Sequence, residues 1–273
     1  MFGYQFKNLN ALPLAPRLFK IGSFMLEEPF AYGKSVIHKI DPRYRVVAAA
    51  LLSVIIAVLT GIEALLAAIT IAGITLAAAK LNPRAVAGRL AVVAGFLFLL
   101  WLVLPVTHPG TVFYTLGPLT LSCEGVLLAT RITLKSFAIL SLLIALVSTM
   151  SVATLGNALN SLGVPGKLTQ LLMVSYRYIF VIEQEYQKLQ RAAKIRGFQP
   201  GTNLHTYRTY AYLAGMLFVR ASLRAQRVYQ AMLCRGFTGR YVSLQTYGAG
   251  PRNPVFAAFM VIALVILIYL EWI

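Results

Sequence analysis

A short motif that could bind an acidic partner occurs twice in the C-terminal half of the chain. Residues 192–198 and 231–237 share the pattern Ala-x-x-x-Arg-Gly-Phe, 39 residues apart. A glycine at this place favours the left-handed turn that ends a helix. The arginine before it complements the negative end of the helix dipole, and its planar guanidinium suits bidentate recognition of a carboxylate.

A single copy could be an ordinary helix cap, but two copies favour a docking function. The residues that we expect to dock are the repeated positions, namely Ala192, Arg196, Gly197, Phe198, Ala231, Arg235, Gly236 and Phe237. Each phenylalanine could pack back on its helix end or enter a pocket of the partner.

Two long amphipathic helices are expected to position these motifs. Apolar residues follow helical spacing from Leu168 to the stop at Gly197, and a second helix is expected from about Leu204 to Cys234. If the second helix is continuous, a supporting basic stripe lies within about 80° of the second motif arginine. The stripe consists of Arg220, Arg224 and Arg227. It could contact a partner or lipid headgroups, and the sequence leaves both open.

The composition indicates a membrane protein. Of the 273 residues, 59% are hydrophobic and 12% are charged, about half of the charged share in an ordinary soluble domain. Five stretches are apolar enough to span or nearly span a bilayer. They are residues 46–61, 63–79, 90–106, 125–150 and 255–270.

The fold class expected is therefore all-α, a polytopic membrane protein with about five transmembrane helices and a helical domain inserted before the last span. The expected division is a cytoplasmic N-terminal arm (1–43), four transmembrane helices (44–150), cytoplasmic coupling helices (151–253) and a fifth transmembrane helix (254–273).

The distribution of charge predicts the orientation. With a cytoplasmic N-terminus and an external C-terminus, 23 of the 25 lysines and arginines lie inside, and the outer loops carry Glu63, Glu124 and Glu271 but no basic residue. This asymmetry follows the positive-inside rule, so the net charge of +17 needs no nucleic-acid partner. The other two cations, Arg131 and Lys135, lie four residues apart in the fourth span, where a structural role is favoured over transport.

Several chemistries are not supported by the residues. Gly33-Lys34-Ser35 lacks the earlier glycine of a phosphate-binding loop, because Glu28 stands there. The three histidines and two cysteines show no metal-ligand spacing. We expect no catalytic residue, no metal ligand and no cofactor bound by this chain.

Taken in order, these motifs resemble a known family. Asp41-Pro42-Arg43, Leu159-x-x-Leu162-Gly163-Val164-Pro165, Tyr176-Arg177-Tyr178-Ile179, Glu183-x-Glu185 and the two Arg-Gly-Phe turns are similar to those of the transmembrane T component of energy-coupling factor transporters, most of all its CbiQ-type cobalt version. The family signature is Ala-Arg-Gly, and Ile195 and Cys234 stand at its alanine position here.

The resemblance implies a non-catalytic subunit of the cell membrane that couples two ABC ATPase subunits to a separate, cobalt-specific, substrate-binding membrane subunit. Arg196 and Arg235 would each pair with acidic groups of one ATPase, and ATP would be hydrolysed by those partners. A self-contained secondary transporter or membrane enzyme is the alternative, and a membrane-anchored nucleic-acid-binding protein is a third possibility.

Overall fold

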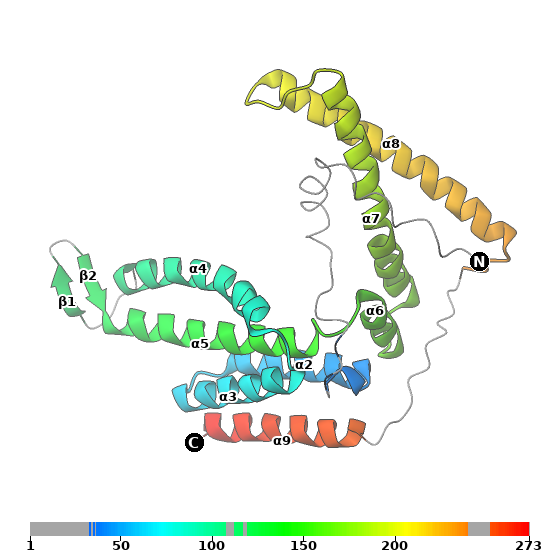
Figure 1. The fold of residues 1–273 in the computed structure, drawn as a ribbon. Helices are drawn as coiled ribbons and strands as arrows, with labels where there is room; N and C mark the ends of the chain where they lie inside the picture. Colours follow the sequence, from blue (N-terminus) through cyan, green and yellow to red (C-terminus); the bar gives the residue numbers. More distant parts are fainter. Residues whose placement is uncertain are drawn as a thin grey trace. The chain divides into compact units, whose positions relative to one another are not determined.

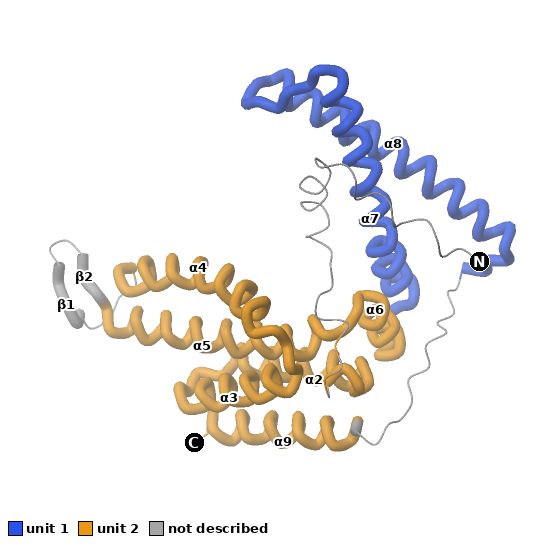
Figure 2. Tube along the Cα trace, viewed as in Figure 1, with its two compact units in different colours: residues 1–27, 165–243 blue, residues 28–164, 244–273 orange. Residues whose placement is uncertain are grey.

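The structure is a computed structural model that describes residues 33, 35, 37–107, 112–116, 119–239 and 252–272. The chain divides into two compact units (Figure 2), and each unit is considered by itself. The membrane unit contains the described residues up to Val164 and those from 252 onwards, and the two-helix unit contains residues 165–239. Most of the expected N-terminal arm, as far as residue 32, lies outside the described residues.

Seven helices and one β-hairpin make up the described part of the membrane unit (Figure 1). In chain order they are η1 (Ile37–Lys39), α2 (Pro42–Val58), α3 (Ile62–Ala79), α4 (Pro83–Thr107), β1 (Val112–Leu116), β2 (Leu119–Ser122), α5 (Cys123–Leu146), α6 (Val152–Ser161) and α9 (Arg252–Trp272). The two-helix unit consists of α7 (Gly166–Ile195) and α8 (Leu204–Cys234).

The structure confirms a helical membrane protein. Helices α3, α4, α5 and α9 are long and apolar enough to cross a bilayer. The first expected span corresponds to α2, whose 17 residues lie at the short end of the range of about 17–25 that can span. The antiparallel hairpin β1–β2 was not expected, although Gly117-Pro118 between its strands is a common turn signal.

The fourth span is shorter than the sequence indicated. Helix α5 ends at Leu146, whereas residues 125–150 were expected to be continuous. A turn follows, and Ser151 then caps α6 by accepting a hydrogen bond from the Thr154 backbone N–H at 3.2 Å. Apolar side chains on both sides of this turn hid it from the hydropathy pattern, because hydropathy does not register helix caps.

Helix α5 is the centre of the membrane unit. It packs against α2, α3 and α4, while α2 and α3 also contact α9, as the layers in Figure 1 show. The buried surfaces are rich in alanine, with Ala64, Ala68 and Ala72 on α3 and Ala138 and Ala145 on α5. Small residues let membrane helices approach closely, which increases their van der Waals contact.

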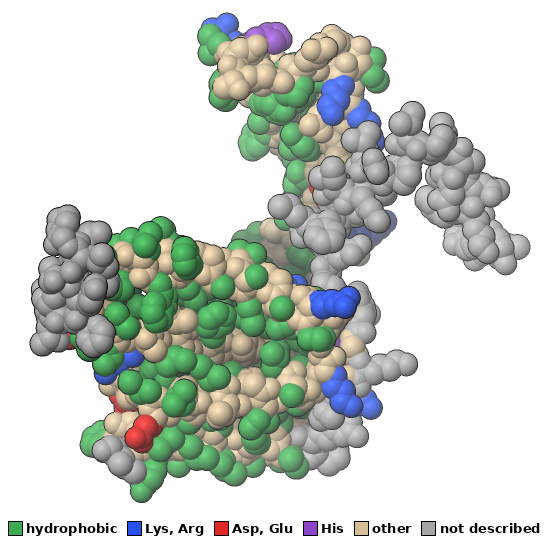
Figure 3. Space-filling view, turned by 60° about the vertical axis from the view of Figure 1, so that its left-hand side comes forward, with side chains coloured by type: hydrophobic (Ala, Val, Ile, Leu, Met, Phe, Trp, Pro, Cys, Tyr) green, Lys and Arg blue, Asp and Glu red, His purple; other side chains and the backbone are tan. Residues whose placement is uncertain are grey.

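The outer surface of the membrane unit is apolar. In Figure 3, hydrophobic side chains cover much of the face in view, and lysine and arginine side chains lie at its edge. On α4, Val92, Phe96 and Phe98 are 77%, 62% and 73% exposed. Side chains of this kind are stable at such exposure when they face lipid.

Polar side chains tie the helix ends of the membrane unit together. At one end of α9, the Asp41 backbone N–H donates to Asn253 Oδ1 (3.2 Å), and Asp41 also caps α2 through the backbone N–H of Arg43 (3.0 Å). At the other end, Glu271 accepts hydrogen bonds from the backbone N–H groups of Thr60 (2.8 Å) and Gly61 (3.1 Å). Glu271 thereby satisfies two backbone donors in the link between α2 and α3, a role that sequence reasoning missed.

The cations inside this unit also act on helix ends. Lys135 donates to the carbonyl oxygen of Ala57, in the last turn of α2, at 2.8 Å. Arg45, only 3% exposed, donates to the hydroxyl of Thr149 at 3.1 Å and so links α2 to the turn after α5. The contact of Lys135 supports the structural role expected for it, and Arg131 is half-buried on the same helix.

We predict that Gly125→Ala destabilises the protein. A Cβ at Gly125 would lie 2.7 Å from the Leu104 carbonyl oxygen and 2.8 Å from the Pro105 Cα, so α4 and α5 must separate. Overpacking of this kind costs about 1–3 kcal/mol and should lower the thermal unfolding midpoint in detergent. The matched control is Gly95→Ala, where the added Cβ has nothing within 4 Å; an equal loss in both variants would contradict the prediction.

Candidate functional site

The two Arg-Gly-Phe motifs end α7 and α8 with the same backbone geometry. Arg196 and Arg235 are the C-cap residues, and the glycines that follow, Gly197 and Gly236, have φ angles of +82° and +80°. The expected left-handed turns are therefore confirmed. Helix α7 begins at Gly166, two residues earlier than expected, and α8 spans 204–234 as expected.

Each turn is closed by the same pair of backbone hydrogen bonds. At the end of α7, the Phe198 N–H donates to the Ala193 carbonyl (3.1 Å) and the Gly197 N–H to the Lys194 carbonyl (3.0 Å). At the end of α8, the corresponding donors are Phe237 and Gly236, and the acceptors are Met232 (3.1 Å) and Leu233 (3.0 Å). This is the Schellman arrangement, which satisfies carbonyls that a helix end leaves unpaired.

The two arginines project from these turns into solvent. Arg196 and Arg235 are both exposed, as are Ala192 and Ala231 one turn earlier. Neither arginine makes an ion pair with a described residue. Two guanidinium groups are thus exposed, each next to a left-handed glycine turn that backbone hydrogen bonds close.

The two phenylalanines pack within the unit. The Phe198 ring is half-buried and stands edge-on to Tyr210 of α8, with 5.7 Å between ring centroids. The Phe237 ring is also half-buried and lines a groove between α7 and α8. The Phe198 ring therefore packs within its own unit, which is one of the two expectations for these rings.

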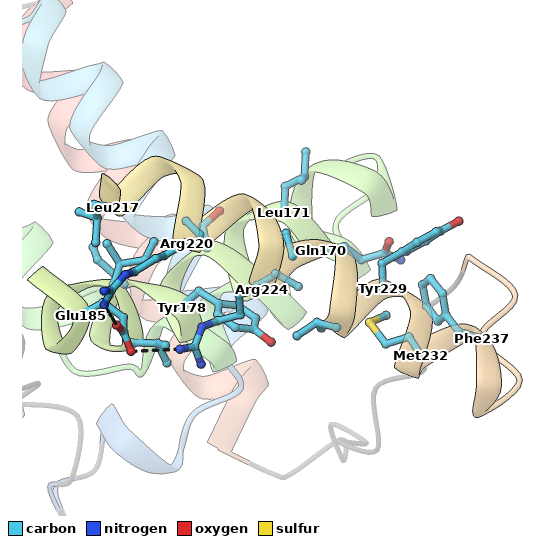
Figure 4. A pocket seen from close by; sticks show the side chains of 18 of the residues that line it. Gln170, Leu171, Tyr178, Glu185, Leu217, Arg220, Arg224, Tyr229, Met232 and Phe237 are labelled. Atoms are coloured by element: carbon cyan, nitrogen blue, oxygen red, sulfur yellow. Dashed lines mark hydrogen bonds and ion pairs between the residues drawn. The ribbon is translucent and has the colours of Figure 1, made fainter. Parts of the chain in front are cut away.

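The supporting basic stripe is mostly bound to α7. Arg220 and Arg224 donate to the two carboxylate oxygens of Glu185 at 3.2 and 3.1 Å, drawn in Figure 4. Arg227 is exposed, and its Nε donates to the backbone carbonyl of Leu223 at 3.3 Å. The stripe therefore joins two helices of the same unit. The sequence had suggested contact with a partner or with lipid headgroups instead.

Glu185 is the acceptor on which three cations converge. Besides the two arginines, Lys188 of its own helix donates at 3.0 Å, and the Glu185 side chain is only 15% exposed. The hydrogen bond from Lys188 is the main cause that lowers the pKa of this carboxyl, and the two arginines add to it. Glu185 is therefore ionised in the folded protein at neutral pH, and its carboxylate pairs with cations of both helices.

An apolar groove of about 860 Å³ runs between α7 and α8 beside this cluster. Apart from Lys167, Gln170, Glu185 and the two arginines, its walls are mostly aliphatic and aromatic. Figure 4 shows Glu185 and Arg224 toward one end of the groove and Met232 and Phe237 toward the other. The second docking turn therefore shares its phenylalanine with the groove.

Within the described residues, no three histidine, cysteine, aspartate or glutamate side chains gather in a way that could hold a metal ion. Cys123 and Cys234 are both exposed and free. The described features of this site are two cationic helix ends, a groove and an internal ion-pair cluster.

Comparison with known proteins assigns the chain to a family. The family model described as "CbiQ: Cobalt transport protein" matches residues 33–247, a range that includes both Arg-Gly-Phe turns and Glu185.

Individual relatives agree with this match. The energy-coupling factor transporter transmembrane protein EcfT of Bacillus subtilis is 26% identical, with 79% of this chain and 85% of that protein covered. The cobalt transport protein CbiQ of Salmonella typhimurium is 30% identical over 38% of this chain and 46% of its own length. An uncharacterized protein of Methanocaldococcus jannaschii is 37% identical, and this chain spans 41% of its length.

We predict that Gly236→Ala weakens the second turn. An L-residue at a φ of +80° costs about 1–2 kcal/mol, so the end of α8 should unwind and exchange its backbone amides faster. Gly215→Ala is the matched control, because it lies inside α8 with nothing within 4 Å of an added Cβ. In the control, the free energy of unfolding should rise by up to about 1 kcal/mol, because alanine has a higher helix propensity than glycine. Amide exchange at the end of α8 that is as slow in Gly236→Ala as in wild type would contradict the prediction.

We also predict a pH-dependent contribution from Glu185. Because its pKa is lowered on folding, its carboxylate stabilises the fold above the ordinary glutamate pKa. That contribution is lost as the pH falls through the lowered value. The difference in thermal midpoint between wild type and Glu185→Gln should therefore be largest near pH 7 and shrink below about pH 4.5.

The control for this measurement is Glu183→Gln. Glu183 accepts a hydrogen bond from Gln187 of its own helix and makes no ion pair with a described residue. At neutral pH, Glu183→Gln should lower the thermal midpoint less than Glu185→Gln does. A larger loss for Glu183→Gln would overturn this interpretation of the cluster.

Proposed function

Because this chain belongs to the CbiQ family of cobalt transport proteins, we propose that it is the non-catalytic coupling subunit of an energy-coupling factor transporter. The observation that carries the proposal is the pair of matching helix ends, each with an exposed arginine beside a left-handed glycine turn. Relatives named as EcfT over most of this chain's length support it.

The proposed partners of these helix ends are two ABC ATPase subunits. Two turns with the same geometry suit two partners that resemble each other, one for each turn. Arg196 and Arg235 would each form charge-assisted hydrogen bonds with a carboxylate of one ATPase. ATP would be bound and hydrolysed by those subunits, since this sequence lacks a phosphate-binding loop.

The other proposed partner is a separate membrane subunit that binds the transported substrate. Cobalt is the substrate named for the family and for the Salmonella relative, and we propose Co²⁺ here on that support. Movement of the ATPases would be passed through α7 and α8 to that subunit.

The proposed orientation places the N-terminus and the two-helix unit in the cytoplasm and the C-terminus outside. Its support is the absence of lysine and arginine from residues 60–63, 107–124 and 271–273, and their abundance elsewhere outside the spans. ATPases are cytoplasmic in such an arrangement, so the docking turns would lie on their side of the membrane.

Reversal of either cap charge should break the proposed coupling. Arg196→Glu and Arg235→Glu each replace charge-assisted hydrogen bonds, worth about 1.5–3 kcal/mol, with repulsion. Co-purification with the ATPase should fall about tenfold or more for either variant, and Co²⁺ uptake by cells that express the whole transporter should fall with it.

Arg191→Glu is the matched control, because Arg191 is exposed on α7 but stands before the cap. It should retain both ATPase binding and uptake. The proposal fails if the purified chain alone transports Co²⁺ into vesicles, as a self-contained transporter would, or if Arg235→Glu still binds the ATPase and supports uptake.

A further inference from the structure

The ion pair between Glu185 and Arg224 has the same sequence separation as the two docking turns. The residues lie 39 positions apart, which is also the spacing of Arg196 and Arg235. Glu185 therefore stands 11 residues before its cap arginine, and Arg224 stands 11 residues before its own. The pair joins equivalent positions of the two repeat copies.

This spacing has a geometric consequence. Eleven helical residues rise about 16 Å and turn through about 1,100°, which is three full turns and about 20° more. Each cap arginine thus lies about 16 Å beyond the ion pair, on nearly the same face of its helix. A contact between equivalent positions of two similar helices lies close to the local twofold axis that relates them.

The interface between α7 and α8 also contains a groove and a ring contact. A groove of about 860 Å³ separates much of the two helices on one side of the ion pair, and Phe198 meets Tyr210 near the connecting turn. Arg220 adds a second bond from α8 to the same carboxylate. Glu185 therefore links α7 to α8 through two ion pairs away from that turn.

We propose that Glu185 is a positioning residue, which fixes the crossing point of α7 and α8 and so sets the separation of the two docking arginines. The inference rests on the proposed function, because the separation of the turns matters only if each binds one ATPase. Equal helix lengths from the crossing point would let two similar partners act on the turns symmetrically.

Loss of the Glu185 charge would remove this constraint. Arg220 and Arg224 are four residues apart on α8, where like charges repel each other, and the carboxylate lies between them and Lys188. With glutamine at position 185, the helices would keep their cap turns but cross at variable angles. Binding at each turn would survive while the distance between the turns became heterogeneous.

The test measures that distance in the assembled transporter. Arg191 and Gln230 occupy equivalent positions of the two copies, five residues before each cap arginine, and both are exposed. Spin labels at Arg191→Cys and Gln230→Cys, in a Cys123→Ser, Cys234→Ser background, report the separation of the two helix ends by double electron–electron resonance. We expect one narrow distribution that shifts with ATP and vanadate.

In that labelled background, Glu185→Gln should at least double the width of the distribution and abolish the nucleotide-dependent shift, with ATPase co-purification kept within about twofold of wild type. Glu183→Gln should leave the width of the distribution, its nucleotide-dependent shift and ATPase co-purification unchanged. The double variant Glu185→Lys with Arg224→Glu restores an ion pair of reversed polarity and should restore the narrow distribution, whereas Glu185→Lys alone should not. A failure to fold would affect stability in all variants without this pattern of rescue.

The inference is overturned if Glu185→Gln keeps a narrow distribution with the normal shift, if the double variant does not rescue it, or if Glu185→Gln loses ATPase binding altogether. Failure of the proposed function would give a different result, because the wild-type chain itself would then not co-purify with an ATPase.

Discussion

Every helix end leaves backbone N–H or C=O groups without partners inside the helix, and this chain is organised around how those groups are satisfied. In the membrane unit, Lys135 of α5 donates to a carbonyl in the last turn of α2, and Asp41 and Ser151 cap the starts of α2 and α6. At the ends of α7 and α8 the partners are the backbone groups of the Arg-Gly-Phe turns themselves. Lipid offers no hydrogen bonds, so membrane helix ends depend on such partners more than helix ends in water do.

The same requirement explains why the two kinds of cation behave differently. Arg45 and Lys135 are used inside the membrane unit, where an unpaired charge is costly. Arg196 and Arg235 stay exposed, because the turn beneath each is already closed by backbone bonds and needs nothing from the side chain. A helix end that is complete in itself leaves its arginine available to another protein.

In the two-helix unit, the cap arginines are exposed while other side chains hold α7 and α8 together. Phe198 and Phe237 are held against their own unit, and Glu185 ties α8 to α7 through Arg220 and Arg224. The arginines of the basic stripe looked from the sequence like a surface for a partner or for lipid. Instead, two of them form ion pairs with Glu185 of α7, and the groove beside them is lined by Phe237 of the second Arg-Gly-Phe turn.

The amino-acid sequence by itself determined the helical class, the apolar segments, the helix stops at Gly197 and Gly236, and the repeat of the two turns. Hydropathy, helical periodicity and glycine capping act over a few neighbouring residues, so they are readable without the fold. The prediction from sequence missed the break after Leu146 and the β1–β2 hairpin, because hydropathy does not register either feature. Only the tertiary structure decided that Glu185 meets Arg220 and Arg224, that Lys135 reaches Ala57, and that Glu271 binds the link before α3. These contacts join residues on different helices, and which side chains meet depends on how the helices cross, a property that no local pattern encodes.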